Sequence, residues 1–455
     1  LTECTVKPLP DQEFTLTLVP KGETVASPED IAGFTFSVPG YQEATVTQFS
    51  KLSIFGLTWY DTGPVCLYSI GCREVELRVL SWNTNLLPTF AKFVDERIPN
   101  VAGSVTGFDI VFLQEVFDED GKAAIAEKWF GEDVKWTWAT LKRDKEKELN
   151  LDGAKVRLLG AMPNNQGTEI AVLRKGDLYI VAGPDSTGLF EITQDGGLMI
   201  LSKYPVVAAS GMIWGDQAGL REEMANKGTL YARIQLDPEN PECYIHVFNT
   251  HLAARDPEFK GPVDGKVGHP DNNWKARKSQ IEELVKFISN CIQDDKVGHP
   301  IILCGDFNVI APFPANWGGD LVVPERVDAT KAIPSPQYDA LMNLLAPHKL
   351  KDAWKEKLAE IPGFTWLGND WKTRPESPWG DKGNPLAKQG WPQRIDYIFY
   401  NAGAETSPLT LRLDTIGRTE WTRKQLKQPF QWNGTQSYVP SDHLGLIATF
   451  TVGPR

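Results

Sequence analysis

The stretch 301–308, Ile-Ile-Leu-Cys-Gly-Asp-Phe-Asn, joins an apolar run to a carboxylate and an amide. The uninterrupted apolar run predicts a strand covered on both faces, because a sheet with one solvated face alternates apolar and polar residues. Side chains alternate along an extended backbone, so Asp306 and Asn308 point to one side while Phe307 points to the other. Two oxygen-bearing groups therefore share one small space. The alternative is a strand that ends in an ordinary turn, since Gly, Asp and Asn are common turn formers.

A second carboxylate, Glu115, lies at the end of another buried run, 108–115, Phe-Asp-Ile-Val-Phe-Leu-Gln-Glu. An ionised carboxylate at the end of a buried strand requires a cation, a network of donors or solvent. Glu115 is therefore a candidate metal ligand, and a strand end that faces the surface is the alternative. Asn83 offers an amide at the end of the preceding strand pattern, 75–85.

Two histidines lie on the strand-like stretch 244–251, Tyr-Ile-His-Val-Phe-Asn-Thr-His. Alternation places Asn249 and His251 on one face and His246 on the other. We therefore expect His251 to join the chemistry and His246 to be a structural histidine whose hydrogen bonds are satisfied.

Two more strand ends carry ionisable residues. Asp396 lies between apolar neighbours in the stretch 393–400, and Asp442 and His443 precede the final apolar run. A neighbouring carboxylate and imidazole could form an acid–base pair, but a Ser-Asp-His triplet could equally cap a turn.

The elements that carry these residues alternate between helix and buried strand. From 276 to 292 apolar residues recur at helical spacing beside a polar flank, which predicts a surface helix packed on a sheet. The helix leads through a Gly-His-Pro turn into the strand at 301, as in a layered α/β domain. Residues 1–73 instead contain short β-branched runs punctuated by Pro and Gly. We therefore expect a small β-rich accessory domain at 1–73 and a catalytic domain at 74–455.

Composition narrows the class of protein. The chain has 455 residues, of which 41% are hydrophobic, so it can bury a large core. No stretch approaches the roughly 20 apolar residues that cross a bilayer, and we expect no transmembrane helix. The net charge of −12 argues against non-specific binding of nucleic acid, although a local basic groove is compatible with an acidic total.

The ends and the cysteines point to export. The chain begins at Leu1 without an initiator methionine, which suggests a processed, secreted product, although trimming would look the same. Cys66 and Cys72 flank a short segment that a disulfide could close in an oxidising compartment. Cys291 and Cys304 lie on an apolar helix stripe and in a buried strand, and we expect both to be reduced core residues.

Six motifs occur in order along the chain: WNTN, LQEVFD, NTHL, GDFN, RIDYIF and SDHLGL. This set resembles the endonuclease/exonuclease/phosphatase superfamily of metal-dependent phosphoesterases. The resemblance implies a four-layer α/β sandwich, with two stacked β-sheets flanked by helices, over about 75–452. Within the superfamily the chain is most similar to the neutral sphingomyelinases, the C-type phosphodiesterases. That similarity rests on the stretches 115–118, 195–205, 226–228 and 337–343.

The resemblance implies a Mg²⁺ site, for which Mn²⁺ or Co²⁺ would be substitutes. Glu115 would be the direct ligand, Asn83 would help directly or through a water, and Asp442 could support a second cation. Asn226 and Lys227 fall where the family places its active-site region and would contact the phosphate. Zinc is disfavoured, because no CxxC or HExxH cluster occurs.

The resemblance also implies catalytic roles. His443 would be the general base, with Asp396 accepting its other ring hydrogen. Asp306 and Asn308 would position the water or the phosphate and hold a bridging proton. His251 would donate to a phosphoryl oxygen or to the leaving group as negative charge develops.

The expected substrate is sphingomyelin or a related phospholipid, hydrolysed to phosphocholine and ceramide or diacylglycerol. The alternatives are a nuclease or a phosphoinositide phosphatase on the same scaffold, or a silent binding module. An inositol phosphatase would be expected to show Trp-Xaa-Gly-Asp-Xaa-Asn, whereas this chain has Leu303-Cys-Gly-Asp-Phe-Asn308. A nuclease should carry a basic groove, which the charge balance does not support. We expect a monomer that acts at a membrane surface.

An aromatic and basic segment between Asp396 and Ser441 is the candidate docking element. It contains Trp421, Phe430 and Trp432 among arginines and lysines, a mixture that suits a membrane interface. Bacterial sphingomyelinases carry an aromatic-tipped hairpin in the corresponding interval. Ordinary packing of these rings is the alternative.

Overall fold

A computed structural model describes the backbone of the residues in the following ranges: 4–5, 13–18, 35–36, 44–45, 50–54, 57–66, 72–88, 91–132, 135–136, 138–141, 145–160, 168–186, 195–216, 218, 225–238, 240–254, 273–314, 332–333, 335–361, 363–366, 393–419, 430–432, 435–437 and 440–455. In 4–66, 430–432 and 435–436 it describes the backbone alone. Structural statements below refer to these residues.

The chain divides into two compact units. The first comprises residues 1–73 with 237–243 and Pro454, and the second comprises the remainder. The first unit contains a four-stranded sheet in the order β1-β2-β6-β5 and a two-stranded sheet, β3-β4, and the described pairs are antiparallel. Its strands are β1 Cys4–Thr5, β2 Glu13–Leu18, β3 Thr35–Phe36, β4 Ala44–Thr45, β5 Ser50–Ile54 and β6 Leu57–Cys66. The described residues of the first unit thus form short antiparallel strands, while the predicted accessory role of 1–73 stays a prediction.

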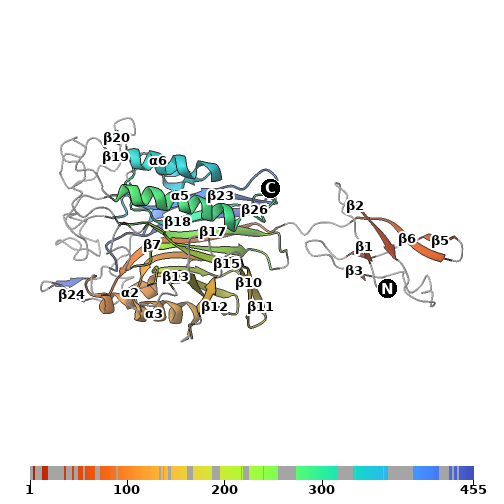
Figure 1. The fold of residues 1–455 in the computed structure, drawn as a ribbon, viewed down its shortest axis with the longest axis horizontal. Helices are drawn as coiled ribbons and strands as arrows, with labels where there is room; N and C mark the ends of the chain where they lie inside the picture. Colours follow the sequence, from red (N-terminus) through yellow and green to blue (C-terminus); the bar gives the residue numbers. More distant parts are fainter. Residues whose placement is uncertain are drawn as a thin grey trace. The chain divides into compact units, whose positions relative to one another are not determined.

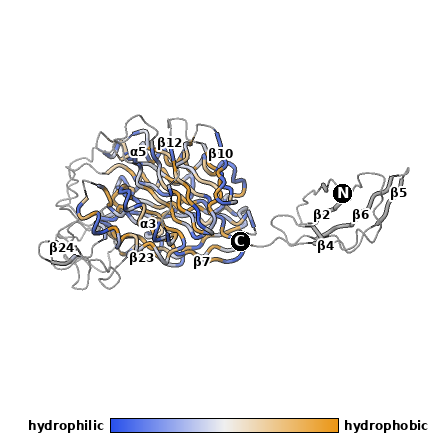
Figure 2. The backbone as a smooth tube through the Cα atoms, turned by 90° about the horizontal axis from the view of Figure 1, so that it is seen from below, coloured by the Kyte–Doolittle hydropathy of each residue, from blue (hydrophilic) through white to orange (hydrophobic). Residues whose placement is uncertain are grey.

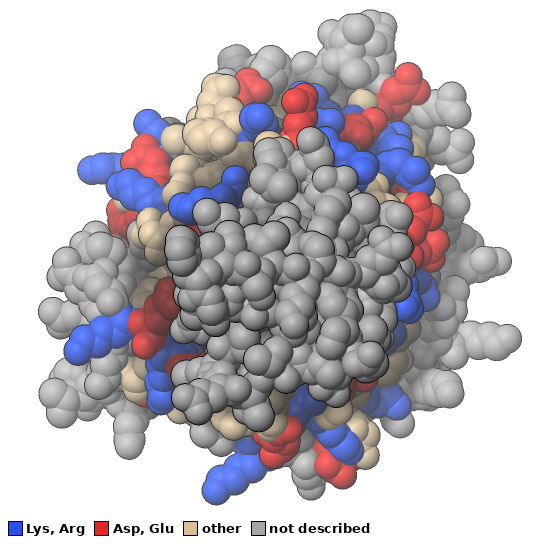
Figure 3. All heavy atoms as spheres, turned by 90° about the vertical axis from the view of Figure 1, so that its right-hand side faces the viewer, with Lys and Arg blue, Asp and Glu red and all other residues tan. Residues whose placement is uncertain are grey.

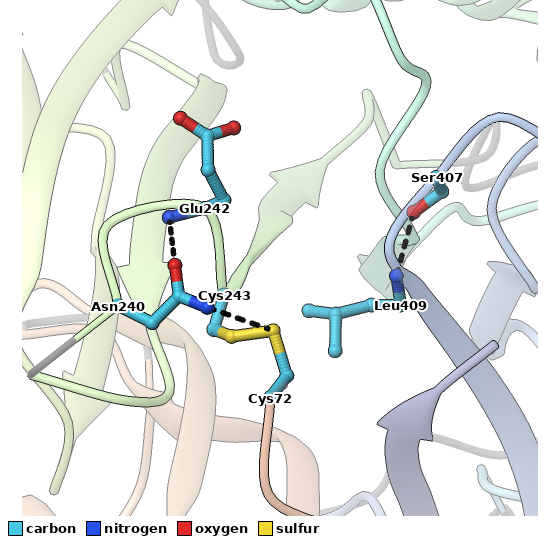
Figure 4. Close-up of a disulfide and its surroundings, with 6 residues drawn as sticks. All are labelled: Cys72, Asn240, Glu242, Cys243, Ser407 and Leu409. Atoms are coloured by element: carbon cyan, nitrogen blue, oxygen red, sulfur yellow. Dashed lines mark hydrogen bonds between the residues drawn. A yellow bond between two sulfur atoms is a disulfide. The ribbon is translucent and has the colours of Figure 1, made fainter. Parts of the chain in front are cut away.

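A disulfide in the first unit joins Cys72 to Cys243, across 171 residues of sequence (Figure 4). Asn240 supports it, donating from its amide nitrogen to the Cys72 sulfur at 3.7 Å. The expected Cys66–Cys72 pairing is therefore wrong. Closeness in sequence suggested that pair, but the partner is supplied by a distant loop that the fold brings to Cys72.

The second unit is built on two eight-stranded sheets. Their orders are β10-β11-β15-β16-β17-β18-β22-β21 and β23-β26-β7-β8-β14-β13-β12-β9. The first sheet contains β10 Lys147–Leu151, β11 Ala154–Leu158, β15 Val206–Ile213, β16 Gly228–Gln235, β17 Tyr244–His251, β18 Ile301–Asp306, β22 Asp396–Asn401 and β21 Lys351–Asp352. The second contains β23 Leu409–Arg418, β26 Leu446–Pro454, β7 Val75–Leu86, β8 Ile110–Val116, β14 Leu198–Ser202, β13 Leu178–Ser186, β12 Thr168–Lys175 and β9 Trp138–Leu141. Two short hairpins complete the strands: β19 Phe313–Pro314 with β20 Ala332–Ile333, and β24 Phe430–Trp432 with β25 Thr435–Ser437.

Helices cover the outer faces of the two sheets, so the order of layers is helix, sheet, sheet, helix (Figure 1). The helices are α2 Val94–Ser104, α3 Glu119–Phe130, α5 Trp274–Cys291, α6 Pro336–Leu345, η2 Ala346–His348 and α7 Ala353–Leu358. The apolar stripe of α5 packs with α6 on the sheet that contains β17 and β18. The apolar faces of α2 and α3 pack on the sheet that contains β7 and β8. The predicted four-layer α/β sandwich is confirmed, and hydrophobic segments concentrate in its inner strands (Figure 2).

Polar side chains join the two sheets at their interface. Asn249 on β17 donates to the main-chain oxygens of Leu113 at 2.8 Å and Met199 at 2.9 Å. It also accepts a hydrogen bond of 2.7 Å from Gln114 on β8. These bonds link the facing strands of the two sheets, and strand ends from both sheets meet at one edge. Among the described helices, none combines the length and the apolar character needed to span a bilayer.

Candidate active site

Three neighbouring strands bring one row of polar residues together. β18 pairs in parallel with β17, where Asp306 lies opposite His251, and antiparallel with β22, where Asp306 lies opposite Asp396. Register therefore fixes the order histidine, aspartate, aspartate across the sheet. The motifs predicted as separate strand ends form one continuous polar row, with Asp306 at its centre.

Asn83 connects this row to the second sheet. Its amide nitrogen donates to Glu115 Oε1 at 3.0 Å and to Asp306 Oδ2 at 3.0 Å, and it is fully buried. Its side-chain oxygen accepts from the backbone N–H of Asn85. In this geometry Asn83 orients two carboxylates from different sheets, while its predicted contact with a metal stays a prediction.

His443 and Asp396 form a buried pair. Nδ1 of His443 lies 2.8 Å from Asp396 Oδ2, and Nε2 lies 4.0 Å from Asp306 Oδ2. Burial lowers the pKa of His443, but the negative charges of Asp396 and Asp442 outweigh it and raise the pKa to about 10. The predicted partnership of His443 with Asp396 has the geometry of an oriented acid–base pair.

A short segment that the motif comparison missed holds this pair in place. The Thr365 hydroxyl accepts from the backbone N–H of Asp396 at 3.2 Å. The indole N–H of Trp366 donates to Asp442 Oδ2 at 3.2 Å, and the Trp366 backbone forms an isolated bridge with His443. Asp442 is therefore close to the site, although the metal-ligand groups found among the described residues do not include it. No periodic pattern marks 363–366 in the sequence, which explains why it was missed.

Asp306 lies at the centre of the site. Its Oδ1 accepts from the backbone N–H of Asn308 at 2.9 Å, and Asn308 donates its amide to the Leu252 main-chain oxygen at 3.1 Å. Burial and the nearby charge of Asp396 raise the pKa of Asp306 to about 7. Asp306 can therefore hold or release a proton near neutral pH.

His251 faces the carboxylates without a hydrogen bond on either ring nitrogen. Its Nε2 lies 3.5 Å from Glu115 Oε1 and 3.7 Å from Asp306 Oδ2, and the residue is 1% exposed. Burial, with the positive charge of Lys227, lowers the pKa of His251 well below its ordinary value. A neutral imidazole with free nitrogens is ready to donate a hydrogen bond to a ligand.

The residues present fit a hard divalent cation. One ligand atom from each of Glu115, His251 and Asp306 lies within 4.8 Å of the others. Burial raises the pKa of Glu115 and the negative charge of Asp442 adds to this rise, while the positive charge of Lys227 opposes it. A buried site with several carboxylate oxygens is an environment that Mg²⁺ can neutralise.

Backbone strain gathers at the same place. Glu115, Asn308 and Asn226 have positive φ values of 56°, 50° and 40° although none of them is glycine. Such residues cost about 1–3 kcal/mol each and cluster at active sites, where the fold holds them against strain. Glu115 is the most informative, because asparagine tolerates this conformation better than glutamate does.

Asn226 and Lys227 lie beside the site, while their predicted contact with phosphate stays a prediction. Both are buried, and the charge of Lys227 lowers the pKa values of Glu115 and His251. Lys227 Nζ donates to the Leu252 main-chain oxygen at 3.4 Å, the atom that also accepts from Asn308. A buried ammonium next to the carboxylates is a suitable partner for phosphoryl oxygens.

Arg97 is a second residue that sequence reasoning missed. It is fully buried on α2 and donates to the main-chain oxygens of Thr84 at 3.0 Å, Asn85 at 2.5 Å and Pro440 at 2.8 Å. It therefore links the end of β7 to the segment that leads to His443. The sequence carries one weak signal, because an arginine that shares a helix face with apolar residues must find buried acceptors.

The proposed docking segment lies largely outside the described residues. Trp421 is not described, while Phe430 and Trp432 belong to β24, of which the backbone alone is described. β24 forms an antiparallel hairpin with β25, in which Trp432 lies opposite Thr435. A hairpin thus occupies the predicted interval, and its role stays a prediction.

The model of the Endonuclease/Exonuclease/phosphatase family matches residues 80–443. The chain belongs to this family. The matched range runs from β7 to His443 and so includes both active-site histidines and the four carboxylates of the site, Glu115, Asp306, Asp396 and Asp442. The superfamily resemblance drawn from the six motifs is confirmed.

Relatives point to one branch of the family. A sphingomyelinase of Dictyostelium discoideum is 34% identical over 126 residues, which are 25% of this chain and 27% of the relative. Sphingomyelinase C of Bacillus cereus is 25% identical over 244 residues, which are 51% of this chain and 57% of the relative. The matches thus span 27% and 57% of the lengths of these curated relatives. Among solved structures, sphingomyelinase C of Streptomyces griseocarneus is 18% identical and covers 82% of this chain and 99% of its own, with a TM-score of 0.44.

Proposed function

We propose that this chain is a Mg²⁺-dependent phosphodiesterase that hydrolyses sphingomyelin, or a related phospholipid, to phosphocholine and ceramide or diacylglycerol. The observation that carries the proposal is the meeting of Glu115, His251 and Asp306 beside the His443–Asp396 pair. Hydrolysis of a phosphodiester requires an activated water, neutralised phosphoryl oxygens and help for the departing oxygen, and this constellation offers groups for each task.

Glu115 would hold the cation, with Asp306 and His251 within reach, and Asp442 would support a second cation. When bound, the ion would supply electrostatic stabilisation of negative charge on the phosphoryl oxygens. Asn83 keeps Glu115 and Asp306 in position by donating to both. Mn²⁺ or Co²⁺ would substitute because these ions accept the same donor types.

His443 would take a proton from the attacking water at Nε2, while Asp396 stabilises the imidazolium through Nδ1. With a pKa of about 10, the His443 imidazole carries a proton at neutral pH in the chain alone. Positive charge held at Glu115 would lower that pKa, because a like charge disfavours the protonated ring. The base form would thus become available when the site is neutralised.

Asp306, Asn308 and His251 would act on the other side of the phosphoryl group. His251 is neutral and donates a hydrogen bond to a phosphoryl oxygen or to the leaving oxygen. Asp306 has a pKa of about 7, so it can accept or release a proton as charge develops. Asn226 and Lys227 would contact the phosphate from the neighbouring turn.

Similarity and overall charge support a phospholipid over a nucleic acid. Curated relatives of the chain include sphingomyelinases and a Staphylococcus aureus phospholipase C, which is 27% identical over 215 residues. The net charge of −12 argues against non-specific binding of nucleic acid. Where described residues are visible in Figure 3, acidic and basic side chains are interspersed. A nuclease or a phosphoinositide phosphatase on the same scaffold is the alternative that the experiment must separate.

Export is part of the proposal. The Cys72–Cys243 disulfide is typical of oxidising compartments, which supports a secreted protein. We further propose that the protein acts as a monomer at membrane surfaces. The β24–β25 hairpin would dock on the bilayer through Phe430 and Trp432, with Trp421 nearby in sequence. Vesicle binding and turnover of a soluble substrate, measured for the variant Trp421→Ala, Phe430→Ala, Trp432→Ala, test this: loss of vesicle binding alone supports docking, and equal loss of both contradicts it.

The function is tested with a substrate panel of sphingomyelin, phosphatidylcholine, a phosphoinositide and DNA, each with Mg²⁺ and with EDTA. The proposal expects phosphocholine from the choline lipids with Mg²⁺ alone. Release of inorganic phosphate or of nucleotides would select the phosphatase or the nuclease instead. Activity that survives exhaustive chelation would contradict the metal site.

A further inference from the structure

A buried lysine outside the catalytic group joins helix α3 to the turn that precedes β14. Lys122 lies in the first turns of α3, and its side chain is 2% exposed. Its ammonium contacts Asp195 Oδ2 at 2.9 Å and Glu119 Oε1 at 2.5 Å. Asp195 is equally buried, at 4% exposure of its side chain, whereas the Glu119 side chain is 78% exposed. The Lys122–Asp195 pair is therefore the buried ionic contact.

Asp195 begins a turn that touches the strand end carrying Glu115. Asp195 Oδ1 accepts from the backbone N–H of Gly197 at 2.9 Å, and the Gly197 main-chain oxygen accepts from the N–H of Val116 at 2.9 Å. A Cβ on Gly197 would lie 2.8 Å from the ring of Phe117. Only glycine allows this approach at its φ of 62°, so the turn is pressed against the residues that follow Glu115.

The same turn also reaches the phosphate-side loop. A Cβ on Gly196 would lie 3.0 Å from the main-chain oxygen of Asn226. Glu115 and Asn226 both hold strained positive φ values, which persist only where surrounding contacts fix them. The turn between these two residues is in the place to supply such contacts.

The surroundings of Lys122 are strongly acidic. A cavity of about 570 Å³ beside α3 is lined by five carboxylates, Asp118, Glu119, Asp120, Asp185 and Asp195. The α3 N-terminus is itself capped by Asp118, whose Oδ1 accepts from Gly121 N–H at 2.8 Å. Because the carboxylate of Asp195 is buried in these acidic surroundings, a positive charge nearby is needed to keep the Asp195–Gly197 turn packed against β8.

We propose that Lys122 is a positioning residue, whose ammonium acts as an internal cation that clamps the Asp195–Gly197 turn against the end of β8 and so fixes Glu115. A buried ion pair is costly to desolvate and is weak evidence for a gain in stability, which favours a role in position. The proposal deepens the proposed function, because it concerns the geometry of the residue expected to hold the cation.

The experiment compares the full-length variants Lys122→Met, Lys122→Arg and Lys122→Ala with the wild type. Mn²⁺ binding is measured by electron paramagnetic resonance. Turnover is measured separately, with sphingomyelin vesicles as the substrate. Lys122→Met is expected to weaken Mn²⁺ binding and lower turnover by about 10- to 100-fold, the range seen when residues that orient metal ligands are lost. Lys122→Arg, which keeps the charge, is expected to retain most of both.

Chemical rescue of Lys122→Ala shows whether the charge of the lysine or only its packing volume positions the turn. The cavity left in Lys122→Ala can admit n-propylammonium, which restores the charge, whereas n-propanol has similar size without it. We expect recovery of Mn²⁺ binding with the ammonium alone. Arg233→Met is the control, because it breaks the 2.6 Å pair with Asp294 at the far end of the other sheet and should leave Mn²⁺ binding unchanged.

If Lys122→Met fails to fold, the double variant Lys122→Met, Asp195→Leu replaces it, since removing both charges relieves the uncompensated carboxylate. The proposal is overturned if either folded variant binds Mn²⁺ and turns over substrate like the wild type, or if propanol rescues as well as the ammonium. Failure of the proposed function has a different signature, because the wild type itself would then release no phosphocholine while Mn²⁺ binding still responds to Lys122.

Discussion

The two ends of strand β17 carry buried histidines in opposite states. At one end both ring nitrogens of His246 are bonded, to the Tyr231 hydroxyl at 2.9 Å and to Asp295 at 3.1 Å. At the other end neither ring nitrogen of His251 has a hydrogen-bond partner, although carboxylates lie within 3.7 Å. The same strand thus ends in a complete network on one side and in an incomplete one on the other.

The difference teaches where function lies in this fold. Asp295 also accepts from His299 and from backbone N–H groups of 297–299, so the His246 end is a closed network that satisfies its own groups. The His251 end combines unbonded nitrogens, a strained Glu115 and a carboxylate with a raised pKa. Groups that the fold leaves unsatisfied are held ready for a ligand. The prediction of a structural His246 is confirmed by its bonds.

The largest effects are expected when His443 or Glu115 is removed from the catalytic site and His246 is removed from the closed end of β17. His443→Ala and Glu115→Gln are expected to lower turnover by about 10² to 10⁴ while the protein stays folded, because they remove chemistry and not packing. His246→Ala is expected to retain turnover per folded molecule but to lose about 1–3 kcal/mol of stability, since it removes the buried hydrogen bonds of the His246 ring to Tyr231 and Asp295. Turnover assays measure the loss of activity in each variant, and urea unfolding measures the loss of stability. Near-normal turnover of folded His443→Ala would remove it from the mechanism.

Chelation should also distinguish the ends. EDTA is expected to abolish turnover, and Mg²⁺ at about 100 times its dissociation constant should add about 2.7 kcal/mol of stability through binding to the folded state. His246→Ala should show the same increment as the wild type, while Glu115→Gln should show little of it. If Mg²⁺ stabilised Glu115→Gln as much as the wild type in thermal unfolding, the ion would have to bind elsewhere.

Asp306→Asn is expected to lower activity and to raise stability above neutral pH. The folded pKa of about 7 lies above the ordinary value of 3.8, so the unfolded chain loses this proton first and stability falls as pH rises from about 4 to 7. In EDTA the variant is expected to unfold a few °C above the wild type at pH 8 and at the same temperature near pH 4, with turnover greatly reduced. A variant less stable than the wild type at pH 8 would contradict the burial cost assigned to Asp306.

The smallest effect concerns acid stability at the closed end. The pKa of His246 is lowered by burial to about 4, below its ordinary 6.5, so its contribution is present above pH 6.5 and lost as pH falls towards 4. His246→Gln should flatten the fall of unfolding free energy between pH 6.5 and 4 relative to the wild type. Urea unfolding across this range measures the slope, and an unchanged slope would assign the acid sensitivity to other groups.

Much of the site followed from sequence because strand alternation and register act locally. Alternation separated His251 from His246, and apolar runs marked the strands near whose ends Glu115 and Asp306 lie and at whose start Asp396 lies. The order of motifs then indicated the family, which the match over 80–443 bears out. The substrate did not follow, because specificity depends on loops around the site and not on the strand ends that all members share.

The polar residues at the ends of buried strands can be identified from the sequence alone, since a periodicity of two assigns each side chain to a face without knowledge of neighbouring strands. Which strands lie side by side depends on the tertiary structure, which places Asp306 between His251 and Asp396 and brings Asn83 across from the other sheet. The same reason explains Cys72, whose partner Cys243 is 171 residues away. Long-range contacts depend on the summed packing of the whole core, which no local pattern encodes.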